Sequence, residues 1–139
     1  MKTLLLAAAM PVVLMDGQAP GLERWVSLEP AVQAALECRQ PLRPSALNGI
    51  TPEAPGSWTL TPARSFTVFG LPVAQVRLFI DPDGELGASY TAVIEKRSAD
   101  QVRKQIRLLE RGKRTGQLSV GQAHGPQQVE LTCTVAADD

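Results

Sequence analysis

Two cysteines set the strongest constraint on how this chain can fold, because they lie near its opposite ends, at Cys38 and Cys133. They are not at metal-ligand spacing, and the single histidine cannot complete a four-ligand zinc site with them unless a carboxylate joins. In an oxidising compartment an even pair of cysteines is expected to bond. We therefore predict a Cys38–Cys133 disulfide that holds the end of the first structural element beside the last; two free buried thiols are the alternative.

The start of the chain predicts that it reaches an oxidising compartment. A basic residue, Lys2, precedes a mostly apolar run at residues 3–15, which is shorter than the roughly 20 residues of a membrane span. This pattern is typical of a secretory signal peptide, and small residues place its cleavage after Ala19. We expect a signal peptide at residues 1–19 and a single periplasmic or secreted α+β domain at residues 20–139, with no transmembrane segment. The alternative is that the leader is a strand or helix of the fold.

Composition excludes two classes of protein. The 139 residues suit one domain, and 44% of them are hydrophobic, which is too many for an intrinsically disordered chain. Basic and acidic residues are equal in number, 14 of each. A protein that coats nucleic acid needs a large basic excess to release counterions, so we expect no nucleic-acid partner.

Helical periodicity predicts a first helix over residues 28–38, with Ser27 as its N-terminal cap. The apolar positions that recur at helical spacing are Leu28, Val32, Ala35 and Leu36. Residues 40–57 then carry four prolines, which leave room for at most one short helical turn, at residues 45–47. We interpret this segment as a connection packed by Leu42, Leu47 and Ile50, with a binding loop as the alternative.

The middle of the chain is predicted to form strands. Residues 58–61 and 66–68 alternate in polarity, and residues 76–80 and 86–94 follow as two strands around a turn at residues 81–84. The turn has the sequence Asp-Pro-Asp-Gly, in which proline presets one backbone angle and glycine accepts the left-handed one. The stretch around Phe69 and Leu71 is predicted to pack in the core, with an exposed apolar knob at a sheet edge as the alternative.

The last third of the chain predicts a second helix and two strands. Ser98 and Gln101 form a capping box, and an apolar stripe of Val102, Ile106 and Leu109 leads to a stop near Gly112. Strands follow at residues 118–120 and 129–135, with Cys133 on the apolar face. We therefore predict an α+β fold in the order α-β-β-β-α-β-β, in which an antiparallel sheet of about five to six strands carries two helices on one face.

Residues suited to catalysis are sparse. The single histidine, His124, lies in a turn, and no nucleophile elbow, phosphate-binding loop or zinc-protease motif occurs. Three carboxylates, Asp81, Asp83 and Glu85, cluster at the hairpin turn, where they lack the glycine and glutamate positions of a calcium loop. We interpret them as a solvated turn, with weak calcium binding as the residual alternative. No cofactor and no metal site is expected.

The clearest functional signal is an uneven distribution of charge. Residues 96–114 hold eight basic residues against two acidic ones, although the whole chain is neutral. Helical spacing predicts that Arg103, Arg107, Arg111 and Arg114 share one solvent-facing side, with Lys104 beside them. A solvated outer face explains such a run, and the functional alternative is a surface that binds carboxylates or phosphates.

These observations predict a small exported protein-binding module without catalytic activity, which uses the basic segment 96–114. An inhibitor or immunity-type protein and an envelope accessory both belong to this class, and the partner would be an acidic protein or another anionic envelope component. The alternative is an envelope hydrolase that uses carboxylates, which would need a cleft gathering acidic residues from distant parts of the chain. The sequence indicates no oligomeric state.

Overall fold

The computed structural model describes residues 19–110, 112–122 and 127–137. His124 and most of the predicted signal peptide lie outside these ranges. In chain order the elements are α1 (Leu22–Leu36), the 3-10 turn η2 (Pro44–Leu47), β1 (Ser57–Leu60), β2 (Thr67–Val68), β3 (Leu71–Ile80), β4 (Ala88–Glu95), α2 (Ala99–Leu109), β5 (Gln117–Gln122) and β6 (Gln128–Val135). The predicted α+β class is confirmed, and the short β2 adds one strand to the predicted order.

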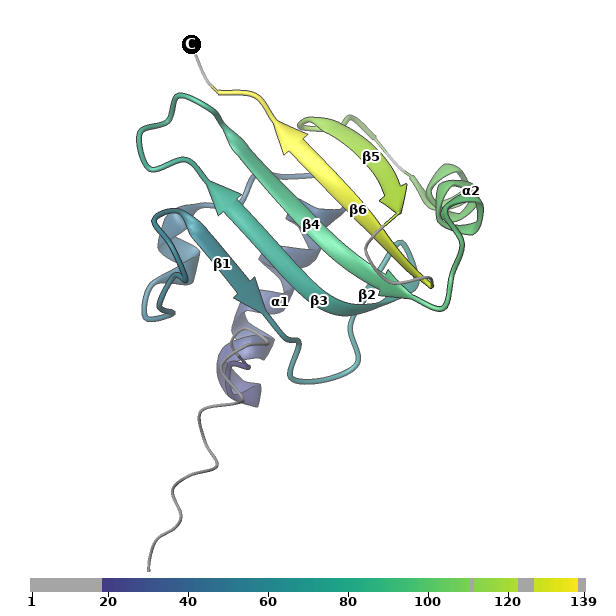
Figure 1. Cartoon of the computed structure of the whole chain (residues 1–139). Helices are drawn as coiled ribbons and strands as arrows, with labels where there is room; N and C mark the ends of the chain where they lie inside the picture. Colours follow the sequence, from purple (N-terminus) through teal and green to yellow (C-terminus); the bar gives the residue numbers. More distant parts are fainter. Residues whose placement is uncertain (1–18, 111, 123–126, 138–139) are drawn as a thin grey trace, which may run out of the picture.

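The sheet is antiparallel and has one apolar face. Its strand order is β1-β3-β4-β6-β5, with β2 paired to β3 (Figure 1). Pairing aligns apolar residues across the strands, so that Leu60, Val76, Ala92 and Leu131 lie side by side. The opposite face carries a matching polar row of Thr59, Arg77, Thr91 and Thr132. This alternation places the core on one side of the sheet.

Both helices contribute to the core on that face. Helix α1 contacts β4 and β6, whereas α2 contacts β5 at the end of the sheet order (Figure 1). Val32 of α1 and Val102 and Ile106 of α2 belong to one cluster of buried residues. The predicted antiparallel sheet with two helices is therefore confirmed, with α1 against the middle of the sheet and α2 beside its β5 edge (Figure 1).

Helix α1 begins six residues before the predicted start, and Ser27 lies inside it rather than at its cap. The reason is a tertiary contact: Trp25 is fully buried, and its ring meets Phe66 edge-to-face at a centroid distance of 5.2 Å. The indole Nε1–H donates to Glu29 over 2.9 Å, a contact across one helical turn that requires helical backbone from residue 25 onward. Pro30 is tolerated because the carbonyl that it leaves unpaired belongs to Val26, on the exposed side of the helix.

Helix α2 confirms the predicted cap. The Ser98 hydroxyl accepts the Gln101 backbone N–H, and the Gln101 side chain accepts the Ser98 backbone N–H in return. The helix ends at Leu109, because Glu110 leaves helical geometry at ψ 135°. Val102 and Ile106 are buried as predicted, but Leu109 is 43% exposed. Only the first two residues of the predicted apolar stripe therefore pack in the core.

The proline-rich connection packs against the core as predicted. Leu42, Leu47 and Ile50 are all buried. The connection is also tied to the elements on either side, since Arg24 of α1 donates to the carbonyls of residues 46 and 48 and the indole of Trp58 donates to that of Ile50.

The predicted disulfide is confirmed and lies in the centre of the molecule. Cys38 follows α1 and Cys133 belongs to β6. Their Cα atoms are 5.4 Å apart, and the two residues are separated by 95 positions in sequence. Both residues are fully buried. The bond therefore joins the first helix to the last strand.

Loss of this bond should be costly. In the chain-entropy model, a loop of this length stabilises the folded state by about 4–5 kcal/mol. We expect the free energy of unfolding, measured by urea titration, to be larger by this amount for the oxidised protein than for the dithiothreitol-reduced protein. Equal urea midpoints for the two forms would contradict the prediction.

An ion pair links α1 to the loop after β1. Arg64 donates to both carboxylate oxygens of Glu29, and this contact, with a smaller contribution from Trp25, holds the pKa of Glu29 below its ordinary value. Such a group adds stability above its unfolded-state pKa, and that stability is lost as pH falls through the lower folded-state pKa.

The free energy of unfolding should therefore fall more steeply in the wild type than in Glu29→Gln when the pH is lowered from about 6 to about 3. Arg64→Met, which removes the partner, should flatten the same part of the profile. Parallel profiles for all three proteins, measured by thermal denaturation in buffers of equal ionic strength, would refute the link.

Candidate functional site

The structure places Arg103, Lys104 and Arg107 on α2, as predicted, but Arg114 lies beyond the end of the helix. Arg103 is held by an ion pair with Asp100 at 3.0 Å and donates to the carbonyl of Val120 in β5 at 3.2 Å. Arg114 comes after the end of α2 and pairs with Glu110. The prediction that Arg114 continues the helix face is wrong, because the chain leaves helical geometry at Glu110. Arg111 lies outside the described residues.

Three exposed residues remain together on α2. Lys104, Arg107 and Leu108 occupy positions i, i+3 and i+4, so their side chains are neighbours on the side of the helix away from Val102 and Ile106. Within the described part of the chain, neither cation has an ion-pair partner. Leu108 is 61% exposed. We call Lys104, Arg107 and Leu108 the outer face of α2.

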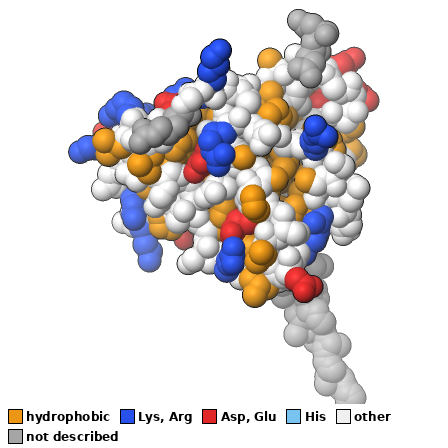
Figure 2. Space-filling view, turned by 180° about the vertical axis from the view of Figure 1, so that it is seen from behind, with side chains coloured by type: hydrophobic (Ala, Val, Ile, Leu, Met, Phe, Trp, Pro, Cys, Tyr) orange, Lys and Arg blue, Asp and Glu red, His pale blue; other side chains and the backbone are white. Residues whose placement is uncertain are grey.

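Other basic side chains are scattered. Figure 2 shows the helix-covered side of the molecule, where Lys and Arg side chains fall into several separate groups with polar and apolar surface between them. The excess of charge in residues 96–114 is therefore not one continuous basic patch. Sequence periodicity identified the cations of the outer face but missed Leu108, because its exposure depends on how the helix docks.

A second feature is a pocket between the ends of the two helices, with a volume of about 150 Å³. Its apolar lining comes from Cys38, Phe69 and Leu109. Its charged lining comes from Glu37, Arg39, Glu110, Lys113 and Arg114. We call it the helix-end pocket. It brings together residues 37–39, the turn after β2, and the chain that follows α2.

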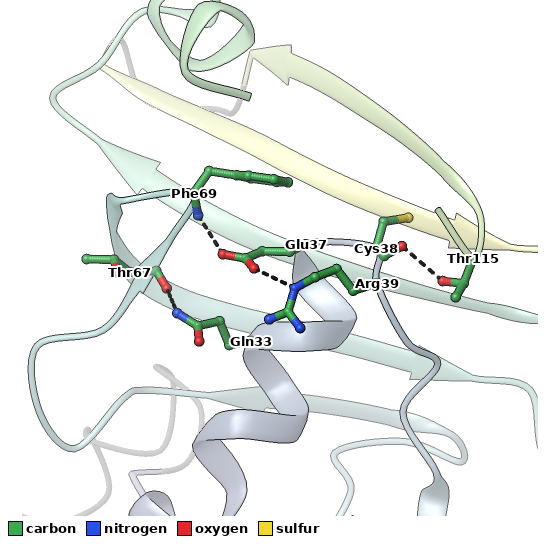
Figure 3. Close-up of polar contacts among 7 residues, drawn as sticks. All are labelled: Gln33, Glu37, Cys38, Arg39, Thr67, Phe69 and Thr115. Atoms are coloured by element: carbon green, nitrogen blue, oxygen red, sulfur yellow. Dashed lines mark hydrogen bonds and ion pairs between the residues drawn. The ribbon is translucent and has the colours of Figure 1, made fainter. Parts of the chain in front are cut away.

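Phe69 forms one wall of this pocket in an unusual backbone conformation. Its φ is +52°, in the left-handed region that non-glycine residues rarely adopt, and Gly70 follows at +76°. The Phe69 N–H donates to the Glu37 carboxylate over 2.8 Å (Figure 3), and its carbonyl accepts from Gln105 of α2 over 3.0 Å. Phe69 and Leu71 are both buried. The predicted core packing of this stretch is therefore confirmed, and the alternative of an exposed apolar knob is not.

Two further contacts fix the walls of the pocket. Gln33 of α1 donates to the carbonyl of Thr67 in β2 over 2.7 Å, which holds the β2–β3 turn against the helix (Figure 3). On the other side, the backbone N–H of Thr115 donates to the carbonyl of Cys38 over 2.8 Å, and its hydroxyl reaches the same oxygen (Figure 3). The chain after α2 is thereby attached to the backbone of Cys38, one of the two disulfide-bonded residues.

The carboxylates of the pocket are engaged in internal contacts. Glu37 pairs with Arg39 at 2.9 Å and accepts the Phe69 N–H. The Arg114 guanidinium beside Glu110 holds the pKa of that carboxyl below its ordinary value. A general acid at neutral pH needs a raised carboxyl pKa, so the lowered pKa of Glu110 does not suit that one role.

The carboxylate cluster at the hairpin turn is also used locally. One oxygen of Asp81 accepts the Leu86 backbone N–H at 2.7 Å and the other accepts the Asp83 N–H at 3.2 Å. These bonds, the Leu86 bond foremost, hold the pKa of Asp81 below its ordinary value. Over residues 19–110, 112–122 and 127–137, no group of three or more His, Cys, Asp or Glu side chains is arranged to hold a metal ion.

Comparison with known proteins identifies no relative: neither the protein-family models, nor the curated proteins, nor the solved structures contain a match to this chain. Among the helices of the described ranges, none combines the length and apolar character needed to cross a membrane.

The role of Glu37 can be tested by two substitutions. Glu37→Ala leaves the partly buried Phe69 N–H without an acceptor and should lower the free energy of unfolding by about 1–3 kcal/mol. Glu37→Gln retains an acceptor oxygen and should lose less than half as much. Urea denaturation measures both values, and an alanine variant as stable as the glutamine variant would contradict the assigned contact.

Proposed function

We propose that this protein is a small exported binding module without catalytic activity, and that the outer face of α2 docks an acidic partner protein. The observation that carries the proposal is the juxtaposition of two exposed cations, Lys104 and Arg107, with the exposed Leu108. An apolar side chain framed by charges of one sign offers both buried area and electrostatic selection to a partner.

Export is supported by two features together. The leader pattern of residues 1–19 is that of a signal peptide, and a fully buried disulfide stabilises a fold that would form in an oxidising compartment. The proposed location is the periplasm or the extracellular medium. An inhibitor or immunity-type protein and an envelope accessory both fit this placement.

A protein partner suits the outer face better than nucleic acid. Two unpaired cations would release few counterions from a phosphate backbone, and no aromatic residue of α2 is available to stack on bases. An acidic protein needs only a few well-placed cations, because electrostatic complementarity mainly selects the partner and accelerates its encounter. A carboxylate-based hydrolase gains no support from the pocket, since Glu37 and Glu110 both serve as ion-pair partners.

Charge reversal on the outer face tests the proposal. We expect Lys104→Glu combined with Arg107→Glu to lower capture of the partner from the source organism's envelope extract by about tenfold or more, because two attractive contacts become repulsive. Capture should also fall as salt is raised to about 1 M, where the screening length shrinks to about 3 Å. Quantitative mass spectrometry of the retained proteins gives the readout.

The matched control is Arg43→Glu combined with Lys96→Glu. Both positions are exposed and neither belongs to the outer face, so this variant has the same net charge with the outer face unchanged. It should capture the partner nearly as well as the wild type. If the two double variants lose capture to the same extent, the effect is one of net charge and the proposed docking face is wrong.

A further inference from the structure

We propose that the helix-end pocket receives one aliphatic side chain of the acidic partner, of about the size of leucine. The inference deepens the proposed function and depends on it for the charge of the partner. It adds a second, apolar contact site that the sequence did not indicate.

The size of the pocket selects this occupant. A volume of about 150 Å³ is half the lower limit of about 300 Å³ for small-molecule and cofactor sites. That space suits a single side chain rather than a metabolite.

Among the described residues the charges around the pocket balance, so an apolar group can enter without opposing an unpaired ion. Glu37 pairs with Arg39, and Glu110 pairs with Arg114. The C-terminal ends of α1 and α2 lie beside the pocket, and each carries a partial negative charge of about one half. Lys113, which has no ion pair within the described ranges, offsets them. The apolar surfaces of Phe69 and Leu109 then decide what binds.

The pocket is also held open before any partner arrives. Left-handed backbone at a bulky residue such as Phe69 is strained and persists only where the surroundings enforce it. Here Glu37 binds its N–H and Gln105 its carbonyl, from two different helices. Strain of this kind is concentrated at ligand clamps, and a preformed wall reduces the entropy lost on binding.

The last turn of α2 lies between the outer face and the pocket. Leu108 belongs to the outer face, and the next residue, Leu109, lines the pocket at 43% exposure, on the side of the helix shared with Val102 and Ile106. An acidic segment that wraps around this turn would pass from Lys104 over Leu108 to the apolar opening. The two sites together would bind a segment of acidic residues that contains one aliphatic residue.

Two synthetic peptides test the pocket separately from the outer face. The probes are acetyl-Asp-Asp-Leu-Asp-Asp-amide and the same peptide with serine in place of leucine, titrated by NMR into the oxidised mature protein. We expect the leucine peptide to bind about fivefold more tightly, because part of its side chain leaves water. Its binding should shift the signals of Leu109 and Phe69.

Leu109→Trp, which fills the opening from a half-exposed position, should reduce the affinity of the leucine peptide to that of the serine peptide. The matched control is Leu86→Trp, at an exposed site in the β3–β4 connection, which should keep the preference. Native-like NMR spectra of both variants verify folding. Equal affinities of the two peptides for the wild type, absence of binding by either, or a leucine preference that survives Leu109→Trp would each overturn the pocket.

The same titrations distinguish this inference from the proposed function. A leucine preference that persists in Lys104→Glu with Arg107→Glu, at undiminished affinity, would uphold the pocket and overturn the outer face. Salt-sensitive binding of both peptides that this double variant abolishes, without a leucine preference, would uphold the outer face and overturn the pocket.

Discussion

The bond between Cys38 and Cys133 is the constraint on which the remaining structure depends. It fixes the end of α1 to β6, which pairs with both β4 and β5. The carbonyl of Cys38 also accepts the N–H of Thr115, so the chain that follows α2 is tied to the same point. One covalent link thus positions the first helix, the last strand and both sides of the helix-end pocket. A core with few aromatic residues gains from such a link, since 4% aromatic content limits what packing alone can supply.

The second helix is held by fewer contacts, and this explains why it presents a surface. Val102 and Ile106 enter the core, while Arg103 and Gln105 bind backbone carbonyls of neighbouring segments. Those four residues cover the inner side and both flanks of the helix. The remaining side, with Lys104 among its residues, faces water. The cations of α2 therefore divide into one that attaches the helix and others that are free to meet a partner.

Features governed by local rules were predictable from the sequence. The capping box of Ser98 and the alternation of the β3–β4 hairpin follow from residue type and spacing. The cysteine pairing is a distant contact that was predictable because the chain holds only two cysteines. The other features that depend on distant contacts were not predictable. The early start of α1 depends on Trp25 meeting Phe66, which is 41 positions away. The left-handed conformation of Phe69 depends on an acceptor from Glu37 and a donor from Gln105, and no short sequence motif predicts it.

The bond from Arg103 to Val120 has a consequence for the colloidal behaviour of the protein. β5 ends the sheet, and a terminal strand exposes backbone groups that can recruit a strand from another molecule and start aggregation. At Val120 the carbonyl is already occupied by a guanidinium. A strand from another molecule would have to displace or desolvate that guanidinium before it could pair with β5. Arg103 therefore opposes strand-to-strand association between molecules at this edge of the sheet.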